Sequence, residues 1–321
     1  MPRPPTTFFS SARLVTAAAA LFAVVLLLHE LDSTRGIASG SGSGEELRAA
    51  VAAEAAAAPT LSPGQYAALR GALQALLAEQ SGVRWGCDCT TAAARAATAR
   101  AASLLPVPLT HVTGPEGYGR TGFERRIDIV QWLAGPLGYS GAGVELGVKQ
   151  GEFAESVLDA WSACAAYTLV DPWVHQESYT DVANVADGKH SEFMAEALKR
   201  TARFGGKVRV MRNFSFQAAA AFDDCSLDFV YVDAVHDFEG ARRDLQDWWP
   251  KLRPGGVMAG HDYLDQINVA GVFGVQTAVD RFAAAANRPV YMTNGYPSVD
   301  GAGLSATIRG VLEWRSFVMI K

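Results

Sequence analysis

From about residue 123 onward, short uninterrupted apolar runs alternate with segments in which apolar residues recur every three or four positions. Continuous apolar runs are typical of strands covered on both faces, and the longer spacing is typical of amphipathic helices. The runs predict strands at 143–148, 167–171, 207–211, 227–233, 256–261, 289–293 and 315–320. The amphipathic segments predict helices at 123–135, 151–161, 190–204, 214–222, 238–251 and 274–286. This alternation predicts a doubly wound, mostly parallel α/β sheet, in which ligands bind beyond the carboxyl ends of the strands.

The first 35 residues have a different pattern, an uncharged apolar run from Leu14 to Leu28 preceded by Arg3 and Arg13. At about 1.5 Å per residue the run spans roughly 22 Å, short of the ~27–30 Å hydrocarbon core of a bilayer. We expect a signal anchor that forms a single transmembrane helix and places the following chain in the lumen of the endoplasmic reticulum or Golgi. A cleaved signal peptide, giving a secreted protein, and an organelle transit peptide are the alternatives.

Residues 36–105 are low in complexity. The stretch 36–44 has the Gly/Ser composition of a flexible linker, and 45–58, 64–80 and 91–105 are Ala-rich with helical spacing. We therefore expect a linker and helical stem over 36–105, followed by a folded domain over 106–321.

Composition narrows the range of functions. The chain of 321 residues is 49% hydrophobic with a formal net charge of -5, so it can bury a large core, and no long basic run indicates binding to nucleic acid. Four cysteines exclude a fold built on disulfides. Cys164 and Cys225 are expected to be lone thiols, while Cys87 and Cys89 are candidates for pairing with another chain in an oxidising lumen.

Candidate chemistry lies at the predicted strand ends. The first strand runs through Glu145 into a turn with Gly147 and Gly151, and the second ends at Asp171, a position suited to holding ribose hydroxyls. The turn lacks the GxGxxG pattern of dinucleotide-binding loops. A turn without a ligand, and a helix cap at Asp171, are the structural alternatives.

The fourth and fifth predicted strands end in Asp233, His236, His261 and Asp262. Neighbouring parallel strands bring these groups to one edge of the sheet, beside the glycine turn. Charged groups resist burial without partners, so a cluster of this kind favours chemistry over packing. A structural role for the histidines remains the alternative.

Three stretches, GVELGVKQGEFAESVL, YTLVDPW and LDFVYVDAVHDFEGARRDLQDWWPKLRPGGVMAGHDY, resemble the class I S-adenosylmethionine-dependent methyltransferases, most closely methyltransferase domain family 24. The resemblance covers about residues 120–321. It implies a Rossmann-like, seven-stranded sheet whose last strand is antiparallel and inserted next to the sixth. It also implies a cofactor site in which Glu145, Gly147 and Gly151 line the methionine part and Asp171 binds the ribose. Ser215, with Asn213 and Phe214, is expected near the adenine, and Asp233 beside the methyl donor.

Methyl transfer requires a positioned acceptor and removal of its proton. His261 is the preferred base and His236 the second candidate, with Asp233 assisting. Alternatively, Asp233, His261 and Asp262 hold Mg²⁺ or Mn²⁺, which acidifies an acceptor hydroxyl. Related metal-dependent enzymes carry an acidic and an amide residue after the fifth strand, where this chain has His261 and Asp262. No group of functional side chains is predicted around His111, His175 or His190. These three histidines are expected on the surface or in loops.

The preferred hypothesis is a membrane-anchored methyltransferase that acts on a hydroxyl of a small molecule or glycan. A nicotinamide-dependent oxidoreductase is the second, opposed by the missing GxGxxG and the two C-terminal strands. A non-catalytic, tethered cofactor-binding domain is the third.

The acceptor pocket is expected to be closed by residues 106–122 and 262–274. Asn213 lies in an N-x-S sequence but is expected to be unglycosylated because the same loop would cover adenine.

Overall fold

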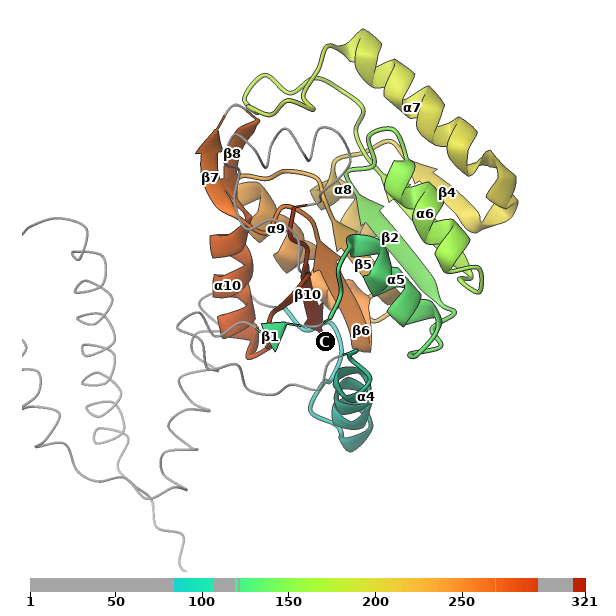
Figure 1. The fold of residues 1–321 in the computed structure, drawn as a ribbon, viewed down its shortest axis with the longest axis vertical. Coiled ribbons are helices and arrows are strands. Elements are labelled where there is room, and N and C mark those ends of the chain that lie inside the picture. The colour runs from blue at the N-terminus through green and yellow to red at the C-terminus, as the bar shows by residue number, and fades with distance from the viewer. Residues whose placement is uncertain (1–83, 107–118, 121, 269, 294–313) are drawn as a thin grey trace, which may run out of the picture. The chain divides into compact units, whose positions relative to one another are not determined.

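The computed structural model describes residues 84–106, 119–120, 122–268, 270–293 and 314–321 (Figure 1). The apolar run 14–28, the Gly/Ser linker and the first two predicted stem helices lie outside these residues. Within the described part of the chain, no helix has both the length and the apolar character that crossing a bilayer requires.

A single large sheet forms the centre of the domain, and its order is β1-β9-β10-β6-β5-β2-β3-β4. The strands are β1 (Gly119–Arg120), β2 (Ala142–Leu146), β3 (Ala166–Val170), β4 (Val208–Met211), β5 (Leu227–Val232), β6 (Leu252–Gly260), β9 (Tyr291–Met292) and β10 (Phe317–Ile320). Strand β10 is antiparallel to both β6 and β9, and the other pairings are parallel. Apart from the two-residue edge strand β1, this is the predicted seven-stranded Rossmann-like sheet, including its antiparallel last strand.

Helices cover both faces of the sheet, as Figure 1 shows. One layer contains α5 (Arg126–Ala134), α6 (Glu152–Ala160) and α7 (Asp187–Thr201), and the other contains α8 (Ser215–Ala218), α9 (Phe238–Trp248) and α10 (Val275–Ala286). Short 3-10 helices follow α7, α8 and α9 at Ala202–Lys207, Ala219–Ala221 and Trp249–Lys251. All six positions of β5 are buried, which explains why the central strands consist of continuous apolar runs.

Strand β6 begins earlier than predicted. The sequence analysis placed its start at residue 256, after the Pro-Gly-Gly turn, but the strand runs from Leu252. Leu227 of β5 pairs with Leu252, and Phe229, only two positions on, pairs with Val257. The extra residues of β6 bulge outward, and Gly255 supplies the positive φ of 76° that this bulge needs.

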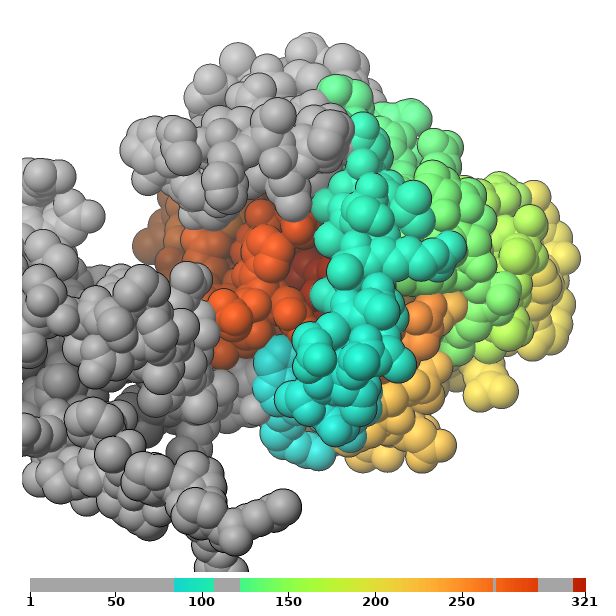
Figure 2. Space-filling model, turned by 90° about the horizontal axis from the view of Figure 1, so that it is seen from below, coloured from blue at the N-terminus to red at the C-terminus, as the bar shows by residue number. Residues whose placement is uncertain are grey.

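The helix predicted at 91–105 is present as α4 (Ala92–Ser103), and the side chain of Thr91 caps its first turn. It packs against β6 and β10, so residues 84–105 belong with the compact domain instead of forming a stem outside it. Figure 2 shows this segment across one end of the domain. In Figure 1 it lies at the opposite end from the hairpin formed by β7 (Asp265–Asn268) and β8 (Gly271–Gly274).

A disulfide between Cys87 and Cys225 fastens the same segment to the loop before β5. The prediction that Cys225 is a lone thiol was therefore wrong, and Cys87 pairs within its own chain. The two positions are 138 residues apart, which is why no local pattern revealed the pairing. Cys89 and Cys164 are free thiols.

Candidate active site

A cleft of about 360 Å³ opens at the carboxyl ends of β2, β3, β5 and β6, where the fold predicts a ligand. Its lining includes these predicted site residues: Gly147, Asp171, Ser215, Asp233, His236, His261 and Asp262. Glu145 and Gly151 do not line it. The cleft thus unites both predicted groups of residues, the cofactor loop and the Asp/His cluster.

Gly147 lets the tips of β2 and β5 approach each other. Its φ is +80°, and a Cβ built on it would overlap the carbonyl oxygen of Asp233. Gly151 has a different role from the one predicted. A Cβ there would approach the Cα of Ala197 to 2.9 Å, so this glycine allows α6 to pack closely against α7.

Glu145 lies beneath the cleft instead of within it, with 2% of its surface exposed. The hydroxyl of Tyr167 donates a hydrogen bond of 3.1 Å to its Oε2. Burial, and secondarily the nearby charge of Asp233, raise the pKa of Glu145 to about 8. Without ligand, this side chain is therefore a neutral acid at pH 7.

Asp171 organises the glycine loop. Its Oδ2 accepts hydrogen bonds from the backbone N–H groups of Val148 and Lys149, each 2.9 Å long, and its Oδ1 accepts one of 2.7 Å from Trp173. Lys149 and Trp173 both have positive φ, 50° and 43°, conformations that non-glycine residues seldom adopt. Burial raises the pKa of Asp171 although these bonds oppose it. The carboxylate therefore stabilises a strained loop at the end of the cleft where the cofactor is expected.

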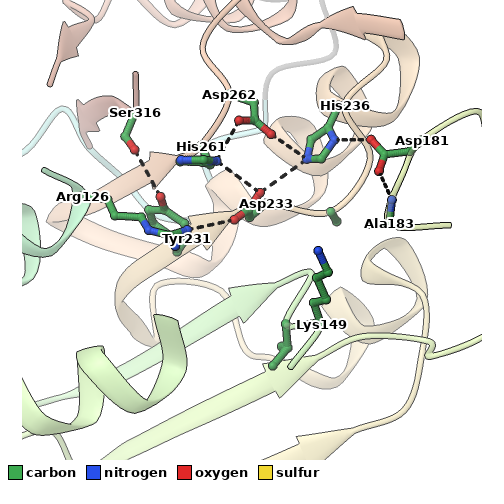
Figure 3. Close-up of polar contacts among 12 residues, drawn as sticks. Arg126, Lys149, Asp181, Ala183, Tyr231, Asp233, His236, His261, Asp262 and Ser316 are labelled. Carbon is green, nitrogen blue, oxygen red and sulfur yellow. Dashed lines mark hydrogen bonds and ion pairs between the residues drawn. The ribbon is translucent and has the colours of Figure 1, made fainter. Parts of the chain in front are cut away.

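The Asp/His cluster forms at the other end (Figure 3). His236 Nε2 lies 3.4 Å from Asp233 Oδ1 and 3.2 Å from Asp262 Oδ2. His261 Nδ1 lies 2.8 Å from Asp262 Oδ1 and 3.9 Å from Asp233 Oδ1. His261 Nε2 is buried and has no hydrogen-bond partner among the described residues. The cluster is compact, and one imidazole nitrogen remains available to a ligand.

The loop between β3 and α7, residues 172–186, supplies a third carboxylate to this cluster. Asp181 Oδ2 lies 3.0 Å from His236 Nδ1, and the His236 backbone N–H donates to the hydroxyl of Tyr179. The Asn184 side chain braces the loop, because it accepts from the N–H of Gln176 and donates to the Gln176 carbonyl. Residues of this loop line the cleft beside the cluster, whereas residues 106–122 and 262–274 are the segments predicted to close the acceptor pocket.

One of those predicted closing segments, 262–274, does border the cleft. It contains the β7–β8 hairpin, and Phe273 of β8 stacks on the His236 ring at 5.3 Å between centroids. Of the other predicted segment, 106–122, most lies outside the described residues.

The charges in the cluster balance one another. Burial by itself lowers the pKa of His236 and of His261, but the carboxylates around them, Asp262 above all, outweigh it and raise both values. The same imidazoles hold the pKa of Asp262 below its usual range although burial opposes them. The carboxylates around them therefore favour the protonated form of both imidazoles.

Asp233, His261 and Asp262 also satisfy the geometry of a metal site, because one donor atom from each lies within 4.8 Å of the others. Two carboxylates and one imidazole are ligands that Mg²⁺ and Mn²⁺ accept, with nitrogen favouring Mn²⁺. The residues present thus fit a divalent cation.

Phe214 and Ser215 line the cleft, and their expected position near the adenine stays a prediction. Ser215 donates a hydrogen bond to Asp244, a buried residue of α9. Burial raises the pKa of Asp244 to about 7. Asn213 is half-buried next to the cleft, and its expected lack of glycan stays a prediction.

Several residues that line the cleft were not predicted from the sequence, among them Arg126 of α5, Asp181, and His190 of α7. Arg126 Nη1 lies 3.5 Å from Asp233 Oδ2. His190 was expected on the surface or in a loop, but its Nε2 is buried. None of the three follows a strand directly, and strand ends were the signal that guided the search.

Residues 144–263 match the model of a family described as a methyltransferase domain. No curated protein matches the chain. Among solved structures, an O-methyltransferase from Bacillus cereus in complex with SAH is 17% identical, with a TM-score of 0.40, over 72% of this chain and 92% of that one. An O-methyltransferase family protein from Burkholderia thailandensis is 13% identical, with a TM-score of 0.40, over 61% and 55%.

The matched segment contains the glycine loop, Asp171 and the whole Asp/His cluster. The resemblance noted in the sequence is thereby confirmed by a family match, which favours methyl transfer over the nicotinamide-dependent alternative. Residues 144–263 therefore match a methyltransferase domain, and the resemblance noted in the sequence is to the class I enzymes that use S-adenosylmethionine.

Proposed function

We propose that the protein transfers the methyl group of S-adenosylmethionine to a hydroxyl of a small molecule or glycan. The observation that carries this proposal is the single cleft that joins the Asp171 loop to the Asp/His cluster. A volume of about 360 Å³ falls within the usual range for small-molecule sites, about 300–1,000 Å³. The geometry supports a nucleoside bound at one end and an acceptor held at the other.

The residues of the cleft fit the cofactor. Asp171 retains acceptor capacity, Phe214 offers an apolar surface to a base, and Lys149 points into the gap (Figure 3) toward the region expected for an anionic group. Bound S-adenosylmethionine supplies an electrophilic methyl group on a sulfonium. These features are the basis for assigning the glycine loop and Asp171 to cofactor binding.

On the acceptor side, the transfer forms an oxygen–carbon bond while the carbon–sulfur bond breaks, and the electron pair of that bond stays on sulfur. His261 is the residue we assign to accept the hydroxyl proton, because its Nε2 is buried and unpaired within the described structure. Its raised pKa means that the neutral form must first be populated. With a divalent cation on Asp233, His261 and Asp262, the cation would instead acidify the hydroxyl.

Incubation of the full-length protein with labelled S-adenosylmethionine and a metabolite extract tests the proposed activity. We expect label in a small molecule or glycan. Loss of transfer with a chelator, restored by Mn²⁺ or Mg²⁺, would assign the cluster to a metal. Cofactor binding with no transfer to any acceptor would favour a non-catalytic domain, and NAD binding without S-adenosylmethionine binding would favour the oxidoreductase.

The substitution His261→Ala tests whether His261 is the general base, separately from cofactor binding. In a chelator-resistant reaction we expect cofactor affinity to be nearly unchanged and turnover to fall about 10²-fold or more. The pH profile adds a second check, because turnover of the wild-type protein should rise with pH through the raised pKa of His261. Equal turnover of wild-type protein and variant would remove His261 from the mechanism.

We also propose that residues 1–35 anchor the protein and that the domain faces the lumen of the endoplasmic reticulum or Golgi. The Cys87–Cys225 disulfide supports this placement, since disulfides persist mainly in oxidising compartments. Protection of the domain from protease in sealed microsomes, lost when detergent is added, is the expected result. Digestion in sealed vesicles would place the domain in the cytosol.

A further inference from the structure

The three hydrogen bonds that Asp171 already accepts limit what it can offer a ligand. An ionised carboxylate has about four acceptor positions. The backbone N–H groups of Val148, Lys149 and Trp173 occupy three of them. One position remains on Asp171, whereas the ribose of a nucleoside presents two neighbouring hydroxyls. The second hydroxyl therefore needs another partner.

His190 lines the same cleft as Asp171 and can supply such a partner. It belongs to the first turn of α7 and is close enough to affect the charge of the Asp171 carboxyl. Its ring packs edge-on against Phe193, with centroids 6.2 Å apart and planes at 89°, which restricts the orientation of the imidazole. The ring is therefore held at the cofactor end of the cleft.

The Nε2 atom of His190 is buried, and no partner for it exists among the described residues. A buried polar atom left without a hydrogen bond is a cost to the stability of the folded protein. Such a cost persists in a folded protein when a ligand satisfies the atom on binding. An imidazole nitrogen can either donate to or accept from a hydroxyl, so it suits a ribose.

We propose that His190 and Asp171 together form a ribose clamp, with one ribose hydroxyl on the free position of Asp171 and the other on His190 Nε2. The clamp rests on the proposed function, since it assigns a residue to the nucleoside of the same cofactor. It also explains why Asp171→Ala alone is a poor test of ribose binding. That substitution releases the strained loop at Lys149 and Trp173 as well as the ribose.

The test is calorimetric titration of the full-length protein with S-adenosylhomocysteine, which binds without turnover. His190→Phe keeps an aromatic ring against Phe193 but removes the nitrogen, and His190→Gln returns a polar group near the same place. We expect His190→Phe to weaken binding about 5- to 30-fold, and His190→Gln to restore most of the affinity. His175→Phe is the control, because His175 does not line the cleft.

Deoxy analogues locate the contact. One of the two deoxy analogues of S-adenosylhomocysteine, lacking either the 2′ or the 3′ hydroxyl, removes the group that contacts His190. This analogue should bind wild-type protein more weakly than S-adenosylhomocysteine does, but it should bind His190→Phe as tightly as S-adenosylhomocysteine does. Without ligand, His190→Phe should melt at the same temperature as wild-type protein or higher, because it removes an unpaired buried nitrogen. A residue needed only for structure would lower the melting temperature.

The possible results separate the two proposals. If wild-type protein binds neither S-adenosylhomocysteine nor S-adenosylmethionine, the proposed function and the clamp both fail. If wild-type protein binds and His190→Phe binds equally well, the clamp alone fails. It fails too if His190→Phe weakens the parent compound and both deoxy analogues by the same factor, because the effect is then not at a ribose hydroxyl.

Discussion

Gly147 lies where the tips of β2 and β5 touch, and its backbone satisfies two demands at once. Its N–H donates to the Val170 carbonyl of β3, which fixes the direction of the turn, and its missing Cβ leaves room for the Asp233 carbonyl. The same carbonyl belongs to the residue that begins the Asp/His cluster. The glycine loop and the cluster therefore meet at this contact, next to the hydrogen bond from the Asp233 N–H to the Leu146 carbonyl.

Gly147→Ala should disrupt that contact. A methyl group would overlap backbone atoms of Asp233, and alanine is strained at a φ of +80°. We expect a loss of about 2–4 kcal/mol in the free energy of unfolding, measured with urea, together with loss of detectable S-adenosylhomocysteine binding. Gly188→Ala is the matched control, since a Cβ there meets nothing within 4 Å. Wild-type behaviour of Gly147→Ala would show that the turn relaxes freely.

The site residues that sequence could predict are those that follow strands. Asp171, Asp233 and His261 each come directly after a buried apolar run, so their common edge follows from the topology. Asp181 and His190 could not be placed in this way. Both come after β3, in a long loop and on a helix, and their positions depend on the Asn184 contacts and on the packing of α7, which no local pattern encodes.

At the scale of whole elements, the segment before the sheet differed most from expectation. Ala-rich helical spacing predicted α4 correctly, but it gave no sign that the helix packs against β6 and β10. Such contacts cannot be predicted from an Ala-rich sequence, because small side chains allow a helix to pack closely without the stripe of large apolar residues that normally indicates a buried face. The early start of β6 was hidden for a related reason. Pro254 and Gly255 indicate a turn, and they are accommodated here in a bulge within the strand.

The disulfide gives α4 a measurable effect on stability. Cys87→Ser removes a cross-link between positions 138 residues apart, so the free energy of unfolding should fall by about 2–4 kcal/mol. Affinity for S-adenosylhomocysteine should not change, because neither cysteine lines the cleft. Urea unfolding and calorimetry measure the two quantities.

Cys89→Ser is the control for that experiment and should match the wild-type protein in both measurements, since Cys89 is a free thiol. Reduction of the unfolded wild-type chain should increase the number of reactive thiols by two. Reduction of unfolded Cys87→Ser should not increase the number of reactive thiols. Equal stability of Cys87→Ser and wild-type protein would mean that α4 docks without help from the cross-link.

At the scale of the whole molecule, four buried ionisable groups around the cleft have pKa values raised by folding: Glu145, His236, Asp244 and His261. Burial raises the pKa of Glu145 to about 8 and that of Asp244 to about 7, and neighbouring carboxylates raise the pKa of His236 and of His261. A group whose pKa is raised by folding contributes stability that is complete below its unfolded pKa and is lost as pH rises through the folded value. Asp181 and Asp262 have the opposite shift, so the stability that they contribute is lost only in acid, below about pH 4.

The ligand-free protein should therefore lose stability between about pH 5 and pH 8. In that window Glu145 remains protonated in the folded state, while an unfolded glutamate, with a pKa of about 4.3, is ionised. The folded state thus holds one more proton on this residue, which lowers the free energy of unfolding by about 1.4 kcal/mol per pH unit. Urea unfolding across the pH range should give a shallower slope for Glu145→Gln than for wild-type protein. Glu177→Gln, which changes an exposed carboxyl, should follow the wild-type slope. Parallel slopes for all three proteins would mean that Glu145 is ionised in the folded state and that its burial is offset by a cation in the cleft.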